Sequence, residues 1–189
     1  MRVIAGIHKG RQLKAVPGKN TRPTTDKVKE SIFQMLGPFF EGGKCLDLFA
    51  GSGSLGFEAI SRGMDTCLFI DKHPQAIQTI KENIKLLKLE NNTEVYRADA
   101  FRALHAASKR GLRFDLIFLD PPYNKISYEK LLDTIEKLNL LADGGLVYCE
   151  YDPSDKLPEK HLYSTIKQAN YGGTIGITIF QKTGGNVND

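Results

Sequence analysis

Apolar residues in most of this chain fall into short runs that alternate with stretches of helical periodicity. The clearest helical stretch carries isoleucine or leucine at positions 77, 80, 84 and 87, a spacing that places them on one face of a helix. Strands alternating with helices predict right-handed β-α-β units and a mainly parallel sheet with helices on both faces. The predicted strands are 45–49, 66–71, 94–98, 115–120, 146–150, 162–168 and 174–181, and the predicted helices are 54–62, 74–88, 101–109 and 128–139.

The end of the chain interrupts this alternation. Its last two strand-like runs are joined through Asn170-Tyr171-Gly172-Gly173, residue types that are typical of a tight turn. They predict an antiparallel hairpin that closes one edge of the sheet. Residues 184–189 carry no periodicity, and we expect them to form a flexible tail after a main domain that spans 44–183.

The first 43 residues follow a third pattern. Runs at 2–5 and 12–16 predict a small hairpin, and a helix is expected to follow it. Thr24 or Thr25 is its expected N-cap, and Asp26 lies in its first turn, where the helix dipole stabilises a carboxylate. Its predicted apolar stripe comprises Val28, Ile32, Met35, Leu36 and Phe39, which leaves Lys27, Lys29 and Glu30 facing outward.

Composition narrows the class of protein. The chain has 189 residues, of which 41% are hydrophobic and 25% charged; this is ordinary for a globular protein and excludes wholesale disorder. No apolar run approaches the roughly 18–20 residues that a membrane span needs, and no signal-peptide pattern precedes the first run, so we expect a cytoplasmic protein. Cys45, Cys67 and Cys149 lie in apolar runs, which predicts buried free thiols.

Positive charge is concentrated at the beginning of the chain. Residues 1–44 hold nine Lys and Arg against three Asp and Glu, a balance of +6, whereas residues 45–189 hold 17 against 19, a balance of −2. A basic segment ahead of a nearly neutral body is consistent with a polyanionic partner, and equally with a solvated basic face.

One motif follows the first predicted strand, in the run DLFAGSGSLG. Gly51, Gly53 and Gly56 satisfy the pattern G-x-G-x-x-G, and Asp71 follows 20 residues after Gly51, where it can accept hydrogen bonds from ribose hydroxyls. Asp47 precedes the glycines and would repel a pyrophosphate but attract a cation. S-adenosylmethionine carries an ammonium, a sulfonium and a ribose without phosphate, so we favour this methyl donor over NAD.

Asp99 follows the third predicted strand. Its carboxylate is suited to accept a hydrogen bond from an adenine amino group, and it is equally suited to cap the next helix. The two roles are compatible.

A second motif, Asp120-Pro121-Pro122-Tyr123, ends the fourth predicted strand. Prolines stiffen the turn and offer carbonyls without competing N–H donors, so Asp120 and the Pro121 carbonyl can converge on one amino group. Tyr123 offers a ring on which a planar base can stack. Such an arrangement suits methylation of an exocyclic amine, whose nitrogen must be turned toward the methyl group.

With these motifs, the sequence resembles the class I S-adenosylmethionine-dependent amino-group methyltransferases. More narrowly, it resembles the RsmD family of bacterial 16S (small-subunit) ribosomal RNA guanine-N2 methyltransferases, through RVIAGIHKGRQLK at 2–14 and RPTTDKVKE at 22–30. The resemblance implies an α/β, Rossmann-like fold with a seven-stranded, mostly parallel sheet and an antiparallel last strand. It also implies methyl transfer to guanine N2 in 16S ribosomal RNA, or in the assembling small subunit, at Asp120, Pro121, Pro122 and Tyr123.

The expected binding residues follow from the motifs and the resemblance together. The donor is expected at Asp47, Phe49, Ala50, Gly51, Ser52, Gly53, Asp71, Lys72, Asp99 and Ala100. The hairpin and helix of residues 1–43 are expected to hold RNA phosphates through Arg2, Lys9, Arg11, Lys14, Lys19 and Arg22. The histidines show no ligand spacing, so no metal is expected.

Three other functions stay open on the sequence. Another amine methyltransferase, acting on DNA adenine N6 or on a protein glutamine, would share both motifs. An NAD-dependent oxidoreductase would share the glycine pattern alone. A non-catalytic RNA-binding protein could retain the fold. The target nucleotide, the choice between naked RNA and ribonucleoprotein, and the oligomeric state do not follow from the sequence.

Overall fold

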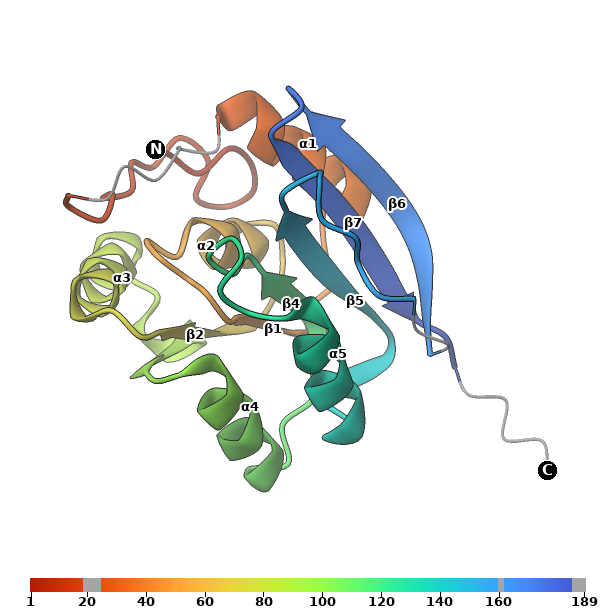
Figure 1. The fold of residues 1–189 in the computed structure, drawn as a ribbon. Helices are drawn as coiled ribbons and strands as arrows, with labels where there is room; N and C mark the ends of the chain where they lie inside the picture. Colours follow the sequence, from red (N-terminus) through yellow and green to blue (C-terminus); the bar gives the residue numbers. More distant parts are fainter. Residues whose placement is uncertain (19–24, 160–161, 185–189) are drawn as a thin grey trace.

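A computed structural model describes residues 1–18, 25–159 and 162–184. Its seven strands form one sheet in the order β3-β2-β1-β4-β5-β7-β6 (Figure 1). The strands are β1 Lys44–Asp47, β2 Thr66–Asp71, β3 Thr93–Arg97, β4 Phe114–Leu119, β5 Leu141–Tyr151, β6 Tyr163–Tyr171 and β7 Ile175–Lys182. The helices are α1 Asp26–Leu36, α2 Ser54–Ser61, α3 Pro74–Leu87, α4 Ala100–Lys109 and α5 Tyr128–Lys137, with a 3₁₀ turn, η1, at Glu90–Asn92.

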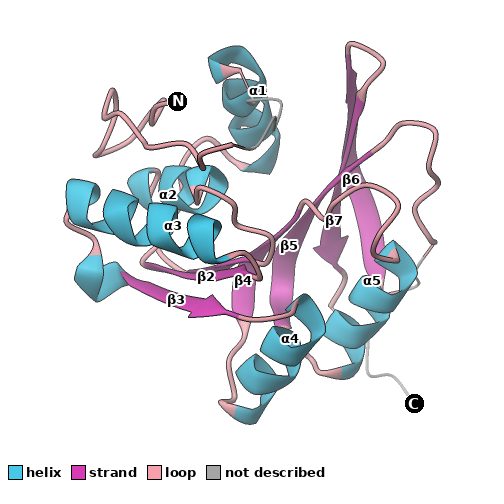
Figure 2. Ribbon diagram, turned by 60° about the vertical axis from the view of Figure 1, so that its left-hand side comes forward, coloured by secondary structure: helices cyan, strands magenta, loops and turns pink. Residues whose placement is uncertain are grey.

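The predicted fold class is confirmed. Neighbouring strands from β3 to β5 pair in parallel, and β7 runs antiparallel to both β5 and β6. Helices α1, α2 and α3 cover one face of the sheet, and α4 and α5 cover the other (Figure 2). Side chains of β4 alternate between the two cores, since Leu116 and Phe118 join the first and Ile117 and Leu119 the second. Burial on both faces explains the nearly continuous apolar sequence of this strand.

The predicted N-terminal hairpin forms only in part. One antiparallel bridge joins Arg2 to Gln12, supported by a hydrogen bond from Val3 N to Arg11 O at 3.0 Å. Val3 and Leu13 are buried in the core that also holds α1 and α2. The segment is therefore an irregular loop that packs on the sheet domain through its apolar side chains.

Helix α1 begins as predicted and ends earlier than its apolar stripe suggested. Thr25 is the N-cap, and its hydroxyl accepts a hydrogen bond from Val28 N at 3.3 Å. The helix stops at Leu36 because Gly37 takes φ +116°, which is outside helical geometry. Phe39, which we expected in the buried stripe, lies beyond this break and is 64% exposed.

The prediction that Lys29 faces outward is wrong. The helical period places it facing outward, yet it is 2% exposed. Its ammonium lies 3.3 Å from Glu58 Oε2 and donates to Arg2 O at 2.6 Å and to Ser54 Oγ at 3.1 Å. A carboxylate on α2 and two oxygens therefore replace the water that this lysine gives up.

Glu58 connects three parts of the structure. It is fully buried, and its carboxylate accepts hydrogen bonds from Ile4 N at 2.9 Å and Ala5 N at 3.0 Å. Arg62, the C-cap of α2, donates to it at 2.9 Å and also donates to Glu30 Oε2 on α1 at the same distance. The N-terminal segment, α1 and α2 are thus held by one buried ion network.

We predict that Glu58→Ala destabilises the protein by about 3–5 kcal/mol, because it leaves Lys29 and Arg62 buried with fewer counter-charges. Urea unfolding followed by circular dichroism measures the loss. Glu82→Ala is the matched control, since it removes an exposed ion pair with Lys14 and should leave the unfolding midpoint nearly unchanged. Equal midpoints for the two variants would contradict a central role for Glu58.

Candidate active site

The glycine motif forms a tight turn between β1 and α2. Gly53 takes φ +83° directly before the helix, a conformation that favours glycine. Gly56 lies against β2, where an added Cβ would come within 2.4 Å of the Phe69 ring and 2.8 Å of Cys67 Sγ. The pattern therefore serves both the turn and the close packing of helix on strand.

Asp71, the last residue of β2, holds this turn in place through hydrogen bonds. Its Oδ2 accepts a hydrogen bond from Gly51 N and its Oδ1 accepts one from His73 N, both at 2.9 Å. A Cβ built on Gly51 meets nothing within 4 Å, so the turn leaves room for a ligand to approach its backbone. Asp71 and the first glycine of the motif lie together, as their spacing predicts.

Asp47 lies beneath the turn and is 3% exposed. Its Oδ2 accepts a hydrogen bond from Gly56 N at 3.2 Å. Burial raises the pKa of Asp47 to about 7, and the charge of Asp71 adds to the effect. No cation of the described residues forms an ion pair with this carboxylate, so a positively charged ligand group would stabilise it.

Asp99 caps α4. Its Oδ1 accepts hydrogen bonds from Phe101 N at 3.0 Å and Arg102 N at 3.2 Å, so the capping role is confirmed. Contact with an adenine remains a prediction.

The other expected donor residues surround the same edge of the sheet. Ser52 O accepts a hydrogen bond from Asn83 Nδ2 at 3.1 Å, and Lys72 O accepts one from Arg97 Nε at 3.1 Å. Phe49 is half-buried, whereas Ala50 and Ala100 are buried. The turn after β1, the end of β2 and the start of α4 therefore form one border.

The second motif directly follows β4, which is the neighbour of β1 in the sheet. Pro121 is buried, while Asp120, Pro122 and Tyr123 are exposed. A hollow of about 880 Å³ lies between this turn, the start of α5 and the segment after β5. Its lining includes Phe101, Pro121, Pro122, Tyr123, Tyr128 and Glu150. The turn therefore borders a space large enough for a planar base.

Glu150, at the end of β5, is a site residue that the sequence analysis did not select. Leu119 pairs with Cys149, so the next residues along the two parallel strands, Asp120 and Glu150, lie side by side. Tyr148 donates a hydrogen bond to Glu150 Oε2 at 2.9 Å. The signal that could have found Glu150 is its position: it ends a predicted strand as Asp120 does.

Desolvation raises the pKa of both carboxyls. The pKa of Asp120 lies well above its ordinary value because the surrounding protein desolvates the carboxylate, and the charges of Glu150 and Asp47 add to this; part of the side chain still meets solvent. Desolvation also raises the pKa of Glu150. The charges of Asp47 on β1 and Glu150 on β5 therefore oppose ionisation of Asp120, which follows the strand between them.

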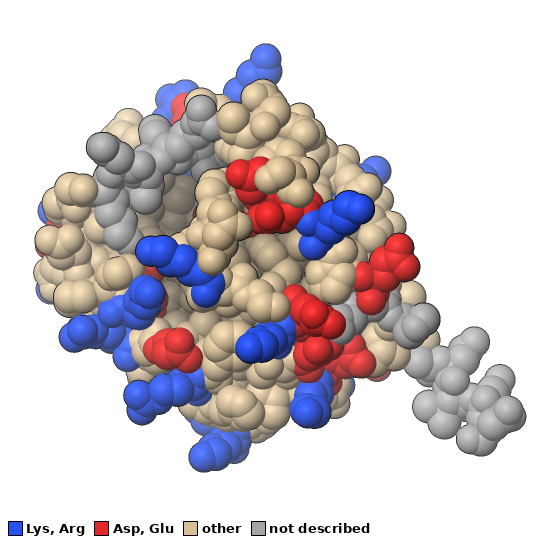
Figure 3. All heavy atoms as spheres, in the orientation of Figure 1, with Lys and Arg blue, Asp and Glu red and all other residues tan. Residues whose placement is uncertain are grey.

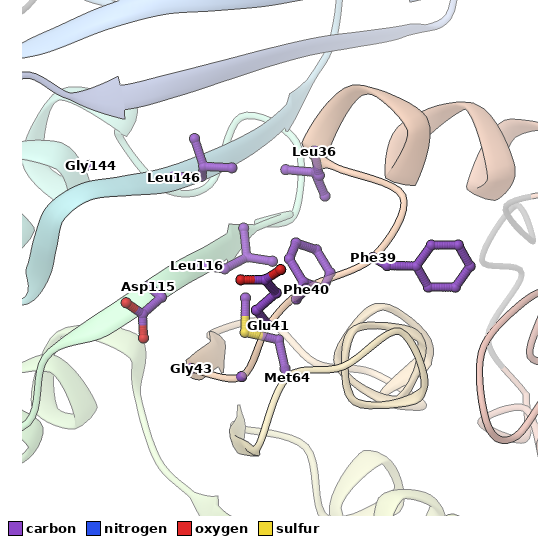
Figure 4. A pocket seen from close by; sticks show the side chains of 11 residues that line it. Leu36, Phe39, Phe40, Glu41, Gly43, Met64, Asp115, Leu116, Gly144 and Leu146 are labelled. Carbon is purple, nitrogen blue, oxygen red and sulfur yellow. The ribbon is translucent and has the colours of Figure 1, made fainter.

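Another pocket, of about 510 Å³, lies at the opposite edge of the sheet (Figure 4). Leu36 and Phe40 line it together with Leu116 near the start of β4 and Gly43 just before β1. It lies at the amino ends of the parallel strands, away from both motifs. We therefore do not assign the reaction to it.

The basic residues of the N-terminal segment are partly engaged within the protein. Arg2 pairs with Asp26 at 2.7 Å, Arg11 donates to Leu86 O at 2.6 Å, and Lys14 pairs with Glu82 at 2.9 Å. Lys9 is exposed, and Lys19 and Arg22 lie outside the described residues. Figure 3 shows further Lys and Arg side chains gathered on the side of the molecule where α3 and α4 lie.

Among the described residues, no group of three or more His, Cys, Asp or Glu side chains is arranged to hold a metal ion. No helix there is long and apolar enough to cross a membrane. The three cysteines are buried and free, as predicted.

The fold and the site define a class I S-adenosylmethionine-dependent methyltransferase. The family described as Conserved hypothetical protein 95 matches residues 1–181. YlbH of Bacillus subtilis (strain 168), provisionally named as an rRNA methyltransferase, is 54% identical over 184 residues, which cover 97% of this chain and 100% of that protein. Ribosomal RNA small subunit methyltransferase D of Escherichia coli (strain K12) is 31% identical over 182 residues, covering 96% and 90%.

Solved structures agree with these relationships. Escherichia coli yhhF, provisionally described as a methyltransferase, superimposes with a TM-score of 0.83 at 32% identity and covers 97% of this chain and 98% of its own. The chain therefore belongs to the Conserved hypothetical protein 95 family, which is the RsmD family that its sequence resembles.

The residues present fit S-adenosylmethionine, the donor of this class. Asp47 supplies a buried negative charge for a cationic group, and Asp71 supplies acceptors beside a turn that leaves room for a ribose. The donor would bring an activated methyl group, and this edge of the sheet would hold it next to the Asp120 turn.

We predict that donor-site affinity rises with pH through the pKa of Asp47. Below about pH 7 the Asp47 carboxyl is protonated and does not attract an ammonium. Affinity for S-adenosylhomocysteine, which keeps the ammonium, should therefore increase roughly fivefold to tenfold between pH 6 and pH 8. Isothermal titration calorimetry measures the change.

Asp47→Asn is the control for this prediction. It keeps the shape and the acceptor for Gly56 N, so its affinity should be lower at pH 8 and nearly independent of pH. A wild-type affinity that does not change over this range would contradict the role given to Asp47.

Proposed function

We propose that this protein transfers a methyl group from S-adenosylmethionine to the exocyclic N2 of a guanine in 16S ribosomal RNA. The observation that carries the proposal is the position of Asp120-Pro121-Pro122-Tyr123 at the end of β4, beside the donor site and at the border of the 880 Å³ hollow. Relatives whose names specify the ribosomal small subunit support the choice of RNA. Action on ribosomal RNA places the protein in the cytoplasm.

The two acceptors of the turn account for the chemistry. The lone pair of an aromatic amine is delocalised into the ring, so the amine must be rotated before its nitrogen can react. The Asp120 carboxylate and the Pro121 carbonyl accept its two N–H groups and turn the lone pair toward the methyl carbon. The nitrogen–carbon bond forms as the carbon–sulfur bond breaks, and S-adenosylhomocysteine leaves.

Asp120 also suits the proton that must depart. The methylated nitrogen carries a positive charge, which a nearby carboxylate stabilises. One N–H proton then passes to Asp120, and desolvation together with the charges of Glu150 and Asp47 raises the pKa of this carboxyl, so it holds the proton more readily than an exposed aspartate. Tyr123, 46% exposed at the rim, supplies a ring on which the displaced base stacks.

Basic residues outside the site are proposed to hold the RNA. The exposed Lys9 and the partly paired Arg2, Arg11 and Lys14 belong to a segment that packs beside the donor turn. Lys19 and Arg22 complete the proposed set. Phosphate contacts of this kind position RNA without selecting a sequence.

Mass spectrometry of nucleosides and proteins separates this proposal from its rivals. The protein is incubated with S-adenosylmethionine and, separately, with ribosomal RNA, assembled small subunits, DNA and protein. We expect N2-methylguanosine in one of the two ribosomal substrates. Methyl incorporation into adenine or glutamine would favour the other amine methyltransferases. Calorimetry with S-adenosylmethionine and with NAD tests the remaining rival, since binding of NAD without binding of the methyl donor would favour an oxidoreductase.

We predict that Asp120→Ala lowers kcat on the order of 10²-fold or more, because it removes both amine orientation and charge stabilisation. Affinity for S-adenosylhomocysteine should change far less, since the glycine turn and Asp71 are untouched. Single-turnover kinetics measure the rate of methyl transfer, and calorimetry measures the affinity for S-adenosylhomocysteine. Wild-type rates in Asp120→Ala would refute the role of this residue, and they would favour a site elsewhere.

We predict that Lys9→Glu weakens RNA binding severalfold. It should also make the salt dependence shallower, so that the magnitude of the slope of log affinity against log salt falls by at least about 0.7. The measurement is filter binding over a range of salt concentrations. Lys137→Glu, on the last turn of α5, is the matched control. The same loss in both variants would show that net charge, and not the N-terminal segment, governs RNA binding.

A further inference from the structure

Glu150 extends the amine-binding turn by one strand. Asp120 and Glu150 follow the paired residues Leu119 and Cys149 on adjacent parallel strands, whose backbones lie about 4.8 Å apart. Successive side chains of a strand point to opposite faces, and Phe118 and Tyr148, two residues earlier, both lie in the core under α1 and α2. Asp120 and Glu150 therefore project from the same face at the same level.

Tyr148 fixes the orientation of this carboxylate. Its side chain is fully buried, and its hydroxyl donates to Glu150 Oε2 at 2.9 Å. The Tyr128 hydroxyl donates to the Glu150 backbone carbonyl, which anchors the end of the strand. Among the described residues, none donates a hydrogen bond to Oε1. One oxygen is thus held by the core, while Glu150 itself borders the hollow.

The edge of guanine that carries N2 presents a second donor next to the amine, the N1–H. We infer that Glu150 accepts this N1–H and thereby selects guanine, while Asp120 and the Pro121 carbonyl hold the N2 amine. The inference rests on the proposed function. Three acceptors then meet three N–H groups, and no donor of the base is left without a partner.

The same contact excludes other amines. Adenine presents an unprotonated N1 beside its amino group, and this lone pair would face the Glu150 carboxylate. Two acceptors in contact repel each other, and the half-buried Glu150 carboxylate would lose its hydrogen bond from the substrate. A site built to accept an N–H rejects an analogue that lacks it far more strongly than it rejects a change of size.

The experiment compares two bases that share the 2-amino group but differ at N1 and in the 6-oxo group, which 2-aminopurine lacks. Synthetic RNA spanning the mapped target carries either guanosine or 2-aminopurine riboside, which keeps the 2-amino group but has no N1–H. It is presented naked or in reconstituted subunits, according to which form the wild-type protein methylates. The quantity measured is the ratio of kcat/KM for guanine to that for 2-aminopurine, so intrinsic reactivity cancels between variants.

Glu150→Gln should lower this ratio at least about tenfold, because the amide can donate to the unprotonated N1 of 2-aminopurine. Tyr148→Phe should lower it by a smaller factor through loss of orientation. Asp152→Asn is the matched control: this carboxylate bonds to Ser154 and does not line the hollow, and its ratio should equal that of the wild type. Circular dichroism and S-adenosylhomocysteine affinity confirm that each variant is folded and binds at the donor site.

Two results would overturn the inference. In one, Glu150→Gln slows both bases by the same factor. In the other, it weakens S-adenosylhomocysteine binding and leaves the ratio unchanged, which would assign Glu150 to the donor. If the wild-type protein methylates neither base at N2, the proposed function itself fails, an outcome that the wild-type arm reveals before any variant is compared.

Discussion

Parallel pairing of β1 with β4 and of β4 with β5 brings three carboxylates to one edge and one face of the sheet. Asp47 ends β1, Asp120 directly follows β4 and Glu150 is the last residue but one of β5, and no cation of the described residues forms an ion pair with them. Desolvation opposes the ionisation of all three carboxyls, and the charges of Asp47 and Glu150 also oppose that of Asp120. A cationic donor and the N–H groups of an amine would relieve both effects and would therefore be stabilised at this edge.

A second constraint links the N-terminal segment to this edge. Lys29 bonds to Ser54 at the start of α2, and Asn83 on α3 bonds both to Lys14 O and to Ser52 O of the donor turn. Glu58 fixes the same segment from below through Ile4 N. Residues 1–14 of the N-terminal segment and the glycine turn are therefore parts of one packed unit, so RNA held by Arg2, Lys9, Arg11 or Lys14 would have a defined position relative to the methyl group.

The features that the sequence predicted are those determined by local pattern. Buried parallel strands, the helix with isoleucines at 77, 80 and 84, and the glycine turn follow from period, turn chemistry and strand ends. The positions of Asp47, Asp71 and Asp120 at the ends of strands were predictable for the same reason, because each residue lies at the end of an apolar run.

The features that it did not predict depend on contacts between distant residues. Lys29 is buried because Glu58, 29 residues later, provides a counter-charge on another helix, and helical period alone counts a lysine as exposed. Phe39 is exposed because Gly37 ends the helix first. Glu150 gains its position from strand register, which the sequence alone does not specify.

The most direct test of the account is to map N2-methylguanosine in small-subunit RNA from cells that have or lack this protein. We expect one guanine to lose its methyl group when the protein is absent. The wild-type protein should restore this methyl group, and Asp120→Ala, produced at the same level, should not. Unchanged methylation in the cells that lack the protein would contradict the proposed function.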